Sequence, residues 1–372
     1  MRKQKILLLL NDTTYAYNLR KELIQRLVEE QYDVAAVCAL LRNQEDLKEL
    51  GCRLIGVKIA RQGTNPISDI GLLVQYIRII FREKPDVVLT YNIKPNVYAG
   101  MVCRMLGITY IANITGLGTA VENPGKLQAL TTRLYKWGVA GADTVFFQNG
   151  ENMRFFREHK MMPKKAKIKL LPGSGVNLES HPVLPYIPGD EVRFLFIARL
   201  LKEKGIELYL SAAERIAEKY PNVMFHICGG CDDPKYLESV KAAELGGHVR
   251  YHGEQKDMLP FFQMAHCVVH PSYYPEGMSN VLLEASASGR PIIATDRSGC
   301  RETVEPGISG YLIPIKDADA LVQAIEDFMN LTWEARMQMG QAGRKKMELE
   351  FDRRIVVQQY MDALKDVQPA AR

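Results

Sequence analysis

A repeated alternation of short β-rich runs with helical patterns constrains the fold of this chain more than any other feature. Strand–helix–strand repetition at this spacing requires right-handed crossovers, so it predicts a parallel sheet with helices on both faces. In the first half of the chain the predicted strands are Ile6–Leu10, Val34–Cys38, Leu54–Val57, Val87–Thr90, Thr109–Asn113 and Thr144–Phe147.

The alternation stops once and then restarts, which predicts two domains. The segment Leu178–Asp190 contains Pro182, Pro185 and Pro188 and is the predicted linker. After it the predicted strands are Arg193–Ile197, Val223–Ile227, Val249–Tyr251, Cys267–Val269, Pro291–Ala294 and Gly310–Ile313, with helices such as Gly205–Lys219 and Ala318–Asn330.

The expected fold is therefore α/β, with two doubly wound Rossmann-like domains that face a cleft. Ligands of such sheets bind outside the carboxyl ends of the strands. We expect an N-terminal domain at residues 1–180, a second domain at 190–350, and a C-terminal helix at 351–372 that packs back toward the first domain. A chain of 372 residues is comfortable for two domains.

The first ten residues are basic and then apolar, which superficially suggests a signal peptide. Asn11 and Asp12 end the apolar run too early, and no small-residue cleavage site follows, so we predict a buried first strand. The seven cysteines are an odd number scattered through apolar contexts, which favours a reducing compartment. We expect a cytoplasmic protein in which Cys228 and Cys231 belong to a strand-end loop and not to a metal site.

Charge is distributed unequally along the chain. Residues 1–180 carry 26 Lys and Arg against 16 Asp and Glu, a formal net charge of +10, and the remainder carries −5. A positive first half favours an anionic partner. The cluster Lys160, Lys164, Lys165, Lys167 and Lys169 is either a solvated loop face or a patch that faces lipid. We expect peripheral association with the anionic inner face of the cell membrane, and no nucleic-acid partner.

The nine residues from Glu276 to Glu284 place two carboxylates around a predicted helix start. Gly277 permits a tight turn, and Ser279 or Asn280 can cap the apolar run that follows. Backbone N–H groups and the helix dipole at such a terminus favour an anion such as a diphosphate. The flanking acids can accept hydrogen bonds from hydroxyl groups, so the spacing suits a sugar nucleotide.

A second constellation, Arg199 and Lys204, follows the predicted strand that ends at Ile197. A guanidinium offers a bidentate fork and an ammonium a point charge, and the two together suit a diphosphate. Both cations would lie at the strand end that corresponds to that of Glu276. We therefore predict that these three residues serve one donor site.

Other nucleotide and metal signatures are missing. No glycine follows the first strand, which excludes the dinucleotide fingerprint, and Lys126 is followed by Leu127, which excludes a phosphate loop. Asp317 and Asp319 resemble the acid pair that binds a metal in one class of sugar transferases, but their position before an apolar helix favours a cap. We expect no metal ion and no cofactor.

Glycines also mark a loop of the first half, from Thr115 through Gly116 and Gly118 to Thr119. Such a loop either lets backbone approach a ligand or forms a tight packing turn. His270 ends an apolar strand and is expected to be structural and not a catalytic base.

With these residues identified, the chain resembles the family 4 retaining glycosyltransferases of the two-domain GT-B fold over nearly its full length. The resemblance is most specific at Arg199, Lys204 and Glu276–Glu284. Four further motifs look like the bacterial capsule, exopolysaccharide and glycan-assembly branch, whose members add sugars to polyprenyl-diphosphate-linked saccharides: Tyr91–Asn96, Ile114–Gly118, Pro172–Asn177 and Gly299–Val304.

The resemblance implies a role for each candidate residue. Arg199 and Lys204 would neutralise the donor diphosphate, Glu276 would hold the donor sugar, and Glu284 would hold the ribose. Backbone groups of Gly277, Met278, Ser279 and Asn280 would complete the phosphate site, and Glu254 lies in the loop expected to meet the base. The acceptor-side candidates are Asn11, Lys94, Thr115, Gly116 and Gly118. Many relatives carry a histidine in the loop where this chain has Thr115–Gly118.

The expected activity is metal-independent transfer, with retention, of a hexose or N-acetylhexosamine from a UDP-sugar to a polyprenyl-diphosphate-linked saccharide in bacterial surface glycan synthesis. Two alternatives stay open. One is a non-hydrolysing sugar-nucleotide epimerase, or a phosphorylase, on the same scaffold. The other is a non-catalytic subunit that binds a sugar nucleotide or scaffolds a membrane assembly.

Overall fold

The computed structural model describes residues 2–59, 66–118, 121, 124–187 and 189–367. Pro188 of the expected linker, Thr119 of the glycine loop and residues 368–372 of the expected C-terminal helix lie outside this range. The chain divides into two compact units. Unit 1 comprises Met1–Ser174, Pro275–Met278 and Arg353–Arg372, and unit 2 comprises Gly175–Tyr274 and Ser279–Asp352.

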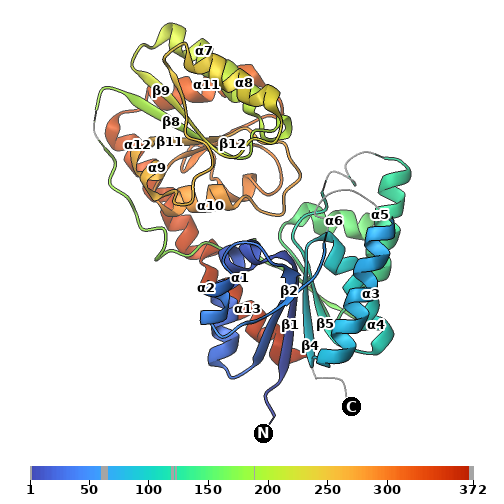
Figure 1. The fold of residues 1–372 in the computed structure, drawn as a ribbon. Coiled ribbons are helices and arrows are strands. Elements are labelled where there is room, and N and C mark those ends of the chain that lie inside the picture. The colour runs from blue at the N-terminus through green and yellow to red at the C-terminus, as the bar shows by residue number, and fades with distance from the viewer. Residues whose placement is uncertain (1, 60–65, 119–120, 122–123, 188, 368–372) are drawn as a thin grey trace. The chain divides into compact units, whose positions relative to one another are not determined.

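Unit 1 is built on a parallel sheet with the strand order β3-β2-β1-β4-β5-β6-β7. Figure 1 labels its strands β1, β2, β4 and β5. The strands are β1 (Lys5–Asp12), β2 (Asp33–Ala39), β3 (Arg53–Gly56), β4 (Val87–Tyr91), β5 (Thr109–Ile114), β6 (Thr144–Phe147) and β7 (Lys167–Leu170). Each of the six strands predicted for the first half is present. Residues Ile6 to Leu10 of β1 are completely buried, as expected of a central parallel strand.

The seventh strand, β7, was not predicted. Its sequence, Lys-Ile-Lys-Leu, is largely exposed, and the lysine pattern favours a loop face or a lipid-facing patch over a strand. Charged residues on an edge strand discourage pairing with other chains, and they also conceal the hydrophobic pattern of a strand. Lys167 and Lys169 lie on β7 and contact the Asp366 carboxylate, at 3.1 and 3.8 Å.

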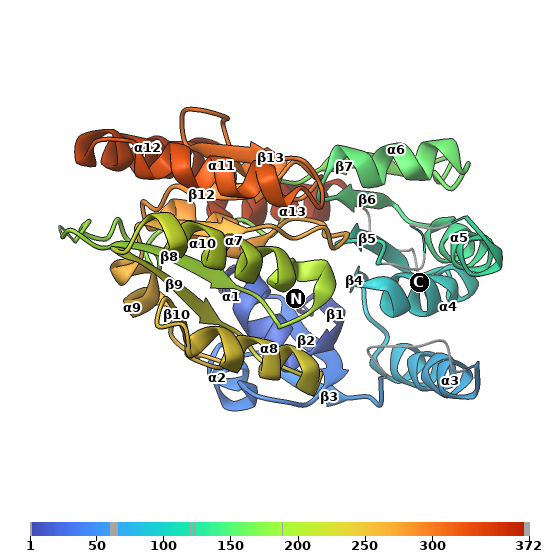
Figure 2. The same ribbon diagram turned by 90° about the horizontal axis from the view of Figure 1, so that it is seen from above.

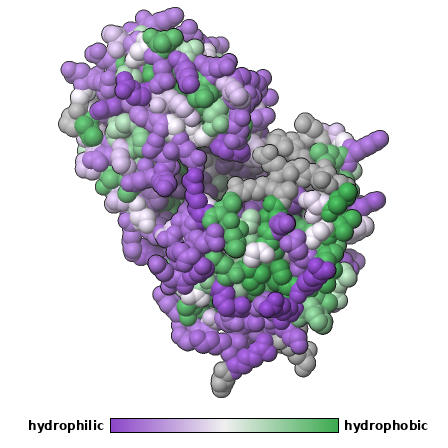
Figure 3. All heavy atoms as spheres, viewed as in Figure 1, coloured by the Kyte–Doolittle hydropathy of each residue, from purple (hydrophilic) through white to green (hydrophobic). Residues whose placement is uncertain are grey.

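Helices cover both faces of this sheet (Figure 2). They are α1 (Thr13–Glu29), α2 (Gln44–Glu49), α3 (Pro66–Glu83), a π-helical turn η1 (Pro95–Ala99), α4 (Gly100–Leu106), α5 (Lys126–Val139), α6 (Gly150–Glu158) and α13 (Arg353–Asp366). One core joins the sheet to α3, α4, α5 and α6, and the other joins it to α1, α2 and α13. Hydrophobic residues also remain at the surface on the side formed by α3 and α5 (Figure 3).

Helix α13 completes the second of these cores although it is the last described element of the chain. Tyr360 is buried beside Tyr91 and Phe146, at ring-centroid distances of 6.2 and 5.0 Å. Arg353 donates to the Asn18 carbonyl and contacts Glu22, both of helix α1, at 3.0 Å. Helix α13 is therefore an integral part of unit 1.

Unit 2 has a parallel sheet with the order β10-β9-β8-β11-β12-β13. Its strands are β8 (Val192–Ile197), β9 (Val223–Cys228), β10 (Val249–Tyr251), β11 (Cys267–His270), β12 (Ile292–Thr295) and β13 (Gly310–Ile313). All six were predicted. In both units the order reverses beside the first strand, which is the signature of a doubly wound fold.

Helices also cover both faces of the unit 2 sheet. They are η3 (Lys202–Lys204), α7 (Ile206–Lys219), α8 (Pro234–Glu244), α9 (Leu259–Met264), α10 (Asn280–Ala287), η4 (Arg301–Thr303), α11 (Ala318–Met329), α12 (Trp333–Lys346) and η5 (Met347–Phe351). Helices α7, α8 and α11 pack on one face of the sheet, and α9 and α10 on the other. Asp317 caps α11 by accepting from the Ala320 N–H at 2.9 Å, as predicted.

The structure differs in three ways from the boundaries expected from the sequence. The chain passes between units at Ser174–Gly175, ahead of the proline-rich segment, and again at Asp352–Arg353. The four residues Pro275–Met278, expected in the second domain, group with unit 1. Helix α7 begins at Ile206, because Gly205 has a left-handed conformation (φ 81°) that ends the preceding turn.

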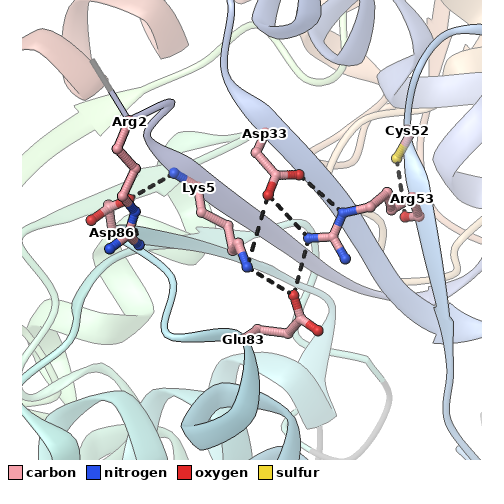
Figure 4. A network of polar contacts seen from close by, with 7 residues as sticks. All are labelled: Arg2, Lys5, Asp33, Cys52, Arg53, Glu83 and Asp86. Carbon is pink, nitrogen blue, oxygen red and sulfur yellow. Dashed lines mark hydrogen bonds and ion pairs between the residues drawn. The ribbon is translucent and has the colours of Figure 1, made fainter.

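Polar contacts tie the amino ends of the first strands together (Figure 4). The Glu83 carboxylate at the end of α3 contacts the Lys5 ammonium at 3.1 Å and the Arg53 guanidinium at 3.0 Å. Arg53 also donates to Asp33 at 3.0 Å, and the Lys5 N–H donates to Asp86 at 2.7 Å. Exposed pairs contribute little singly, but this network joins β1, β2, β3 and α3 at one edge.

Two helices of unit 1 approach so closely that only glycine fits between them. A Cβ on Gly138 of α5 would lie 2.4 Å from the Asn96 carbonyl oxygen and 2.6 Å from the Val97 Cα. A Cβ on Gly100 of α4 would lie 2.1 Å from the Gly138 carbonyl oxygen. This contact fixes α5 against the turn that follows β4.

We expect Gly138→Ala to destabilise the protein by about 1–3 kcal/mol, because the added methyl group must push backbone apart. Gly71→Ala is the matched control, since Gly71 lies in helix α3 and a Cβ there would meet nothing within 4 Å. The control should stabilise by about 0.5–1 kcal/mol, because alanine is the better helix former. Urea unfolding measures both, and equal effects would contradict the close packing.

Candidate functional site

The candidate residues of unit 2 all follow strands that are neighbours in the sheet. Arg199 and Lys204 follow β8, Glu254 follows β10, and Ser279 precedes α10 in the connection after β11. Because β10, β9, β8 and β11 are adjacent and parallel, their carboxyl ends share one edge. The strand order reverses between β8 and β11, which is where doubly wound sheets bind phosphate-containing ligands.

Backbone contacts hold Arg199 at this edge. The Leu200 N–H donates to the Gly230 carbonyl at 2.8 Å, which joins the loop after β8 to the loop after β9. A Cβ on Gly229 would lie 1.8 Å from the Ala198 carbonyl oxygen, so glycine is required there. The Arg199 guanidinium contacts the Asp232 carboxylate at 3.4 Å, and both side chains are exposed. The guanidinium is thus accessible, with a carboxylate partner that an anionic ligand would have to displace.

Lys204 is held beside the chain that follows β11. Its ammonium lies 4.8 Å from the centroid of the Tyr274 ring, a cation–π contact. The Tyr273 N–H donates to the Glu203 carbonyl at 2.9 Å, and a Cβ on Gly205 would lie 2.3 Å from the Pro271 carbonyl oxygen. The lysine loop and the loop that leads to Glu276 are therefore packed together along Pro271–Tyr274.

Helix α10 begins at Asn280, with Ser279 at the cap position. The sequence predicted a capping side chain, but Ser279 makes no side-chain cap bond to the helix. Its hydroxyl instead lies 3.4 Å from His270 Nε2, and its N–H donates to the Gly299 carbonyl at 2.8 Å. His270 is buried and supports Ser279, in line with the structural role predicted for it. Glu284 is the fifth residue of the helix.

The loop that carries Glu254 is held by a pair of histidines. His226 Nδ1 lies 2.9 Å from His252 Nε2, and the two rings stack at 5.2 Å. Burial, followed by the neighbouring His252, lowers the pKa of His226 to about 4. Burial also lowers the pKa of His252. Both rings are therefore neutral near pH 7, and one donates a hydrogen bond to the other.

In unit 1 a chain of side-chain contacts joins two acceptor-side candidates. The Asn11 N–H donates to Asn92 Oδ1 at 3.2 Å, and Asn92 Nδ2 lies 3.5 Å from Thr115 Oγ1. Asn92 has a left-handed backbone (φ 64°), and its side chain contacts both the carboxyl end of β1 and the loop after β5. Sequence reasoning missed Asn92 as a linking residue, although it lies in the quoted motif Tyr91–Asn96.

Lys94, a further acceptor-side candidate, has a defined partner. Its ammonium lies 2.7 Å from the Asp69 carboxylate, which also accepts from the Tyr98 hydroxyl at 2.9 Å. Asp69 belongs to α3 and is buried, so the contact fixes the start of that helix beside the turn after β4. Burial, followed by Asp69, raises the pKa of Tyr98.

The segment Pro275–Met278 packs within unit 1 without room for a side chain at Gly277. A Cβ there would lie 2.3 Å from both Gln148 Oε1 and the Thr115 carbonyl oxygen. A Cβ on Gly116 would lie 3.3 Å from the Gly277 N atom, so the glycine loop is a close packing turn. This contact favours the packing alternative for Gly116. Gly118 also has a left-handed backbone (φ 69°).

Asn149 fixes this segment and was not foreseen from the sequence. Its Nδ2 donates to the Glu276 carbonyl at 3.1 Å and to the Gly277 carbonyl at 2.6 Å. Its Oδ1 caps α6 by accepting from the Asn152 N–H at 2.8 Å. These partners lie more than 120 residues from Asn149 in sequence, so no local pattern predicts the contact. The one local signal at Asn149 is its position as a helix-capping residue before α6.

The structure thus assigns the candidates to two groups. Arg199, Lys204, Glu254, Ser279, Asn280 and Glu284 belong to unit 2, and Asn11, Lys94, Thr115, Gly116, Gly118, Glu276, Gly277 and Met278 belong to unit 1. Tyr274, which Lys204 contacts, precedes Glu276 by two residues. Among the described residues, no group of three or more His, Cys, Asp or Glu side chains could hold a metal ion.

Comparisons with known proteins give two separate family matches along the chain. The profile "Glycosyl transferases group 1" matches residues 184–346, and "Glycosyl transferase 4-like" matches residues 5–149. The chain is 24% identical to the N,N'-diacetylbacillosaminyl-diphospho-undecaprenol alpha-1,3-N-acetylgalactosaminyltransferase of Campylobacter jejuni, over 93% of this chain and 94% of that protein.

Two further proteins extend the comparison. The UDP-Gal:alpha-D-GlcNAc-diphosphoundecaprenol alpha-1,3-galactosyltransferase of Escherichia coli is 24% identical over 80% of each chain. The crystal structure of Anabaena HepE in complex with UDP and glucose superposes with a TM-score of 0.78 at 15% identity, covering 98% of this chain and 100% of that one. The fold predicted from the sequence, two Rossmann-like domains of the GT-B class, is confirmed.

We expect the protein to lose stability as the pH falls from about 6.5 toward about 4. An unfolded histidine titrates near pH 6.5 and His226 near 4, so between these values the unfolded state binds more protons. His226→Gln should flatten this dependence of melting temperature on pH. His266, whose pKa burial also lowers to about 4, is left unchanged in both proteins. Identical slopes in the two proteins would rule out this role for His226.

Proposed function

We propose that this glycosyl transferase moves a hexose or N-acetylhexosamine from a UDP-sugar to a polyprenyl-diphosphate-linked saccharide. Its first half matches the 4-like family of glycosyl transferases, and its second half matches group 1. The product would be an intermediate of bacterial surface glycan synthesis. The names of two relatives support this choice of acceptor, since both specify a diphospho-undecaprenol saccharide. A fold neighbour that holds UDP and glucose supports the donor.

The observation that carries the proposal is the cationic edge of unit 2. Arg199 and Lys204 follow β8, and the amino end of α10 follows β11, on the two sides of the strand-order reversal. The diphosphate would replace Asp232 as the partner of Arg199. Glu254 would meet the base and Glu284 the ribose hydroxyls, while Glu276 would hold the donor sugar.

The reaction would proceed with retention at the anomeric carbon. The bond from this carbon to the donor diphosphate breaks, and the acceptor hydroxyl oxygen bonds to the same face of the sugar. The hydroxyl proton passes to the departing phosphate oxygen, so no protein base is required. Arg199, Lys204 and the α10 terminus would stabilise the charge that develops on the diphosphate. The cations supply this stabilisation without a metal ion.

Asn11, Lys94 and Thr115 are proposed to serve the acceptor. Asn11 lies at the carboxyl end of β1, and Lys94 and Thr115 follow β4 and β5, around the strand-order reversal of unit 1. The Asn11–Asn92–Thr115 contacts and the Lys94–Asp69 pair give these groups fixed positions. The net charge of +10 in residues 1–180 supports peripheral association of the protein with the anionic inner face of the cell membrane. The lipid-linked acceptor would be held in that membrane.

Transfer assays test the proposal. The protein is incubated with a panel of UDP-sugars and a short-chain prenyl-diphosphate saccharide, with and without EDTA, and NMR assigns the anomeric configuration of the product. We expect EDTA-resistant transfer with retention from one donor. Interconversion of UDP-sugars without acceptor would instead identify an epimerase. Donor binding without turnover under any condition would identify a non-catalytic subunit.

We predict that Arg199→Ala and Lys204→Ala each lower kcat by on the order of 10² or more, because each removes charge that acts on the departing diphosphate. Lys202→Ala is the matched control. Lys202 lies in the same turn as Lys204 but contacts Glu207 at 3.8 Å, and its loss should leave kcat unchanged. Near-normal turnover in both test variants would refute the assigned roles.

We also predict that Asn149→Asp slows transfer while preserving the fold. Aspartate keeps the oxygen that caps α6 but loses the N–H groups that hold the Glu276 and Gly277 carbonyls. Misplacing the sugar-binding residue should lower kcat by about 10-fold or more. Asn152→Ala, which keeps the Asn149 side chain intact, is the control. A lower melting temperature with normal kcat would mean that Asn149 serves stability alone.

A further inference from the structure

Helix α3 carries a stripe of exposed apolar residues along its whole length. Ile67, Ile70 and Phe81 are 82%, 62% and 69% exposed, and Val74 and Ile77 are also exposed. These five residues recur at intervals of three and four, which places them on one side of the helix. The opposite side, with Leu72, Tyr76 and Ile80, is buried in the core. A helix that only packs against its own sheet does not need apolar residues on its outer side. The exposed stripe of α3 therefore calls for an explanation.

Helix α5 repeats the pattern, and α4 continues it. Leu127, Leu130 and Trp137 of α5 are exposed and lie at helical spacing, with Trp137 53% exposed. At the end of α4, Met105 and Leu106 are exposed as well. Helix α4 packs against both α3 and α5 on the same face of the sheet (Figure 2). Their outer sides therefore form one surface, which we call the α3–α5 face.

The charges of the α3–α5 face have one sign. The exposed cations of the three helices are Arg78, Arg82, Arg104, Lys126, Arg133 and Lys136. The acidic residues of these helices are Asp69 and Glu83. Asp69 is paired with Lys94, and Glu83 is paired with Lys5 and Arg53. Hydrophilic side chains protrude among hydrophobic ones on this side of unit 1 (Figure 3). The face thus combines apolar area with uncompensated positive charge.

We propose that the α3–α5 face is where the protein docks on an anionic lipid bilayer, with α3 and α5 lying in the plane of the headgroups. Amphipathic helices that bind in this way carry aliphatic and aromatic residues on one side and Lys or Arg beside them. The apolar residues enter the boundary between headgroups and acyl chains, and the cations contact lipid phosphates. No helix in the described parts of the chain is long and apolar enough to span a membrane.

Charge complementarity selects this occupant over a second copy of the chain. Two copies joined through the α3–α5 face would bring arginines and lysines of both against one another without acidic partners, which is unfavourable. An anionic bilayer supplies the opposite charge. The cluster of lysines from Lys160 to Lys167 lines a hollow with Arg104 and Lys136, and the acidic residues of its lining are Asp143 and Asp366. The cations outnumber the acids there, so net positive charge continues beyond the ends of α4 and α5.

The orientation of α3 suits the proposed reaction, and only in this respect does the inference rest on the proposed function. At its start, Asp69 contacts Lys94, an acceptor-side candidate, and at its end Glu83 contacts the amino ends of the strands. Eighteen residues span about 27 Å. A bilayer on this face would therefore run beside the sheet from its acceptor-side edge, where a lipid-linked saccharide could enter from the membrane.

Vesicle co-sedimentation tests the docking surface with the full chain. We expect binding to phosphatidylglycerol-containing vesicles and weak binding to pure phosphatidylcholine vesicles. The double variant Ile70→Glu and Phe81→Glu should bind the anionic vesicles about 10-fold or more weakly, because each glutamate removes apolar area and adds repulsion. Leu245→Glu is the matched control: Leu245 is 90% exposed in unit 2, and its replacement should change nothing. Circular dichroism verifies folding of each variant.

The two tryptophans permit an independent measurement. Trp333 packs against Tyr186 and His266 in unit 2, at 4.7 and 5.6 Å, whereas Trp137 lies on the α3–α5 face. In a Trp333→Phe variant, Trp137 is the single reporter. Its emission should shift to the blue on anionic vesicles and be quenched by brominated acyl chains. Unchanged emission on vesicles that bind the protein would overturn the proposed face.

Two further outcomes would overturn the inference. One is equal binding of the wild type and the double variant, and the other is self-association that the double variant abolishes without any vesicle binding. Failure of the proposed function is distinguishable, because transfer to a water-soluble, short-chain acceptor does not need docking. The double variant should keep that transfer and lose transfer to a vesicle-borne acceptor. A protein that binds vesicles but transfers no sugar would refute the function and leave the docking surface intact.

Discussion

The structure depends on the pairing of backbone amides and carbonyls in two parallel sheets whose central strands are buried. A parallel strand cannot follow its neighbour through a short turn, so every connection must cross the sheet and return in the same direction. All loops that follow strands therefore gather at one edge of each unit. Chemistry-bearing residues as distant in sequence as Arg199, Glu254 and Ser279 reach a common edge for this reason alone.

The sequence predicts most of the fold because buried strands are short apolar runs, and twelve such runs correspond to strands. It fails at β7, where lysines on an edge strand conceal the pattern. The same distinction applies to the candidate site. Arg199, Lys204 and the start of α10 belong to local motifs beside predicted strands. Asn92 and Asn149 act through partners 23 to 128 residues away, which no local pattern encodes.

Glycines permit close contacts between backbone segments in both units. Gly277 and Gly116 allow backbone segments to meet within unit 1, and Gly138 allows α5 to approach the turn after β4. Gly205 and Gly229 let loops of unit 2 pack at the edge that carries the cations. In each case a missing side chain, and not an added contact, determines the local geometry. Sequence alone distinguishes such glycines from loop glycines poorly, because the neighbour that excludes a Cβ is remote.

The division of the chain also sets an order of assembly. Helix α13 leaves the ribosome only after all of unit 2 has been synthesised, yet Tyr360 and Arg353 complete the core against α1 and β4. During translation the face of the unit 1 sheet that α13 covers therefore stays partly exposed until all strands of unit 2 have been synthesised. Nascent chains halted shortly before α13 would expose hydrophobic residues of α1 and β4 that α13 covers in the finished protein, and chaperones that bind such surfaces would recognise this intermediate in preference to the finished protein.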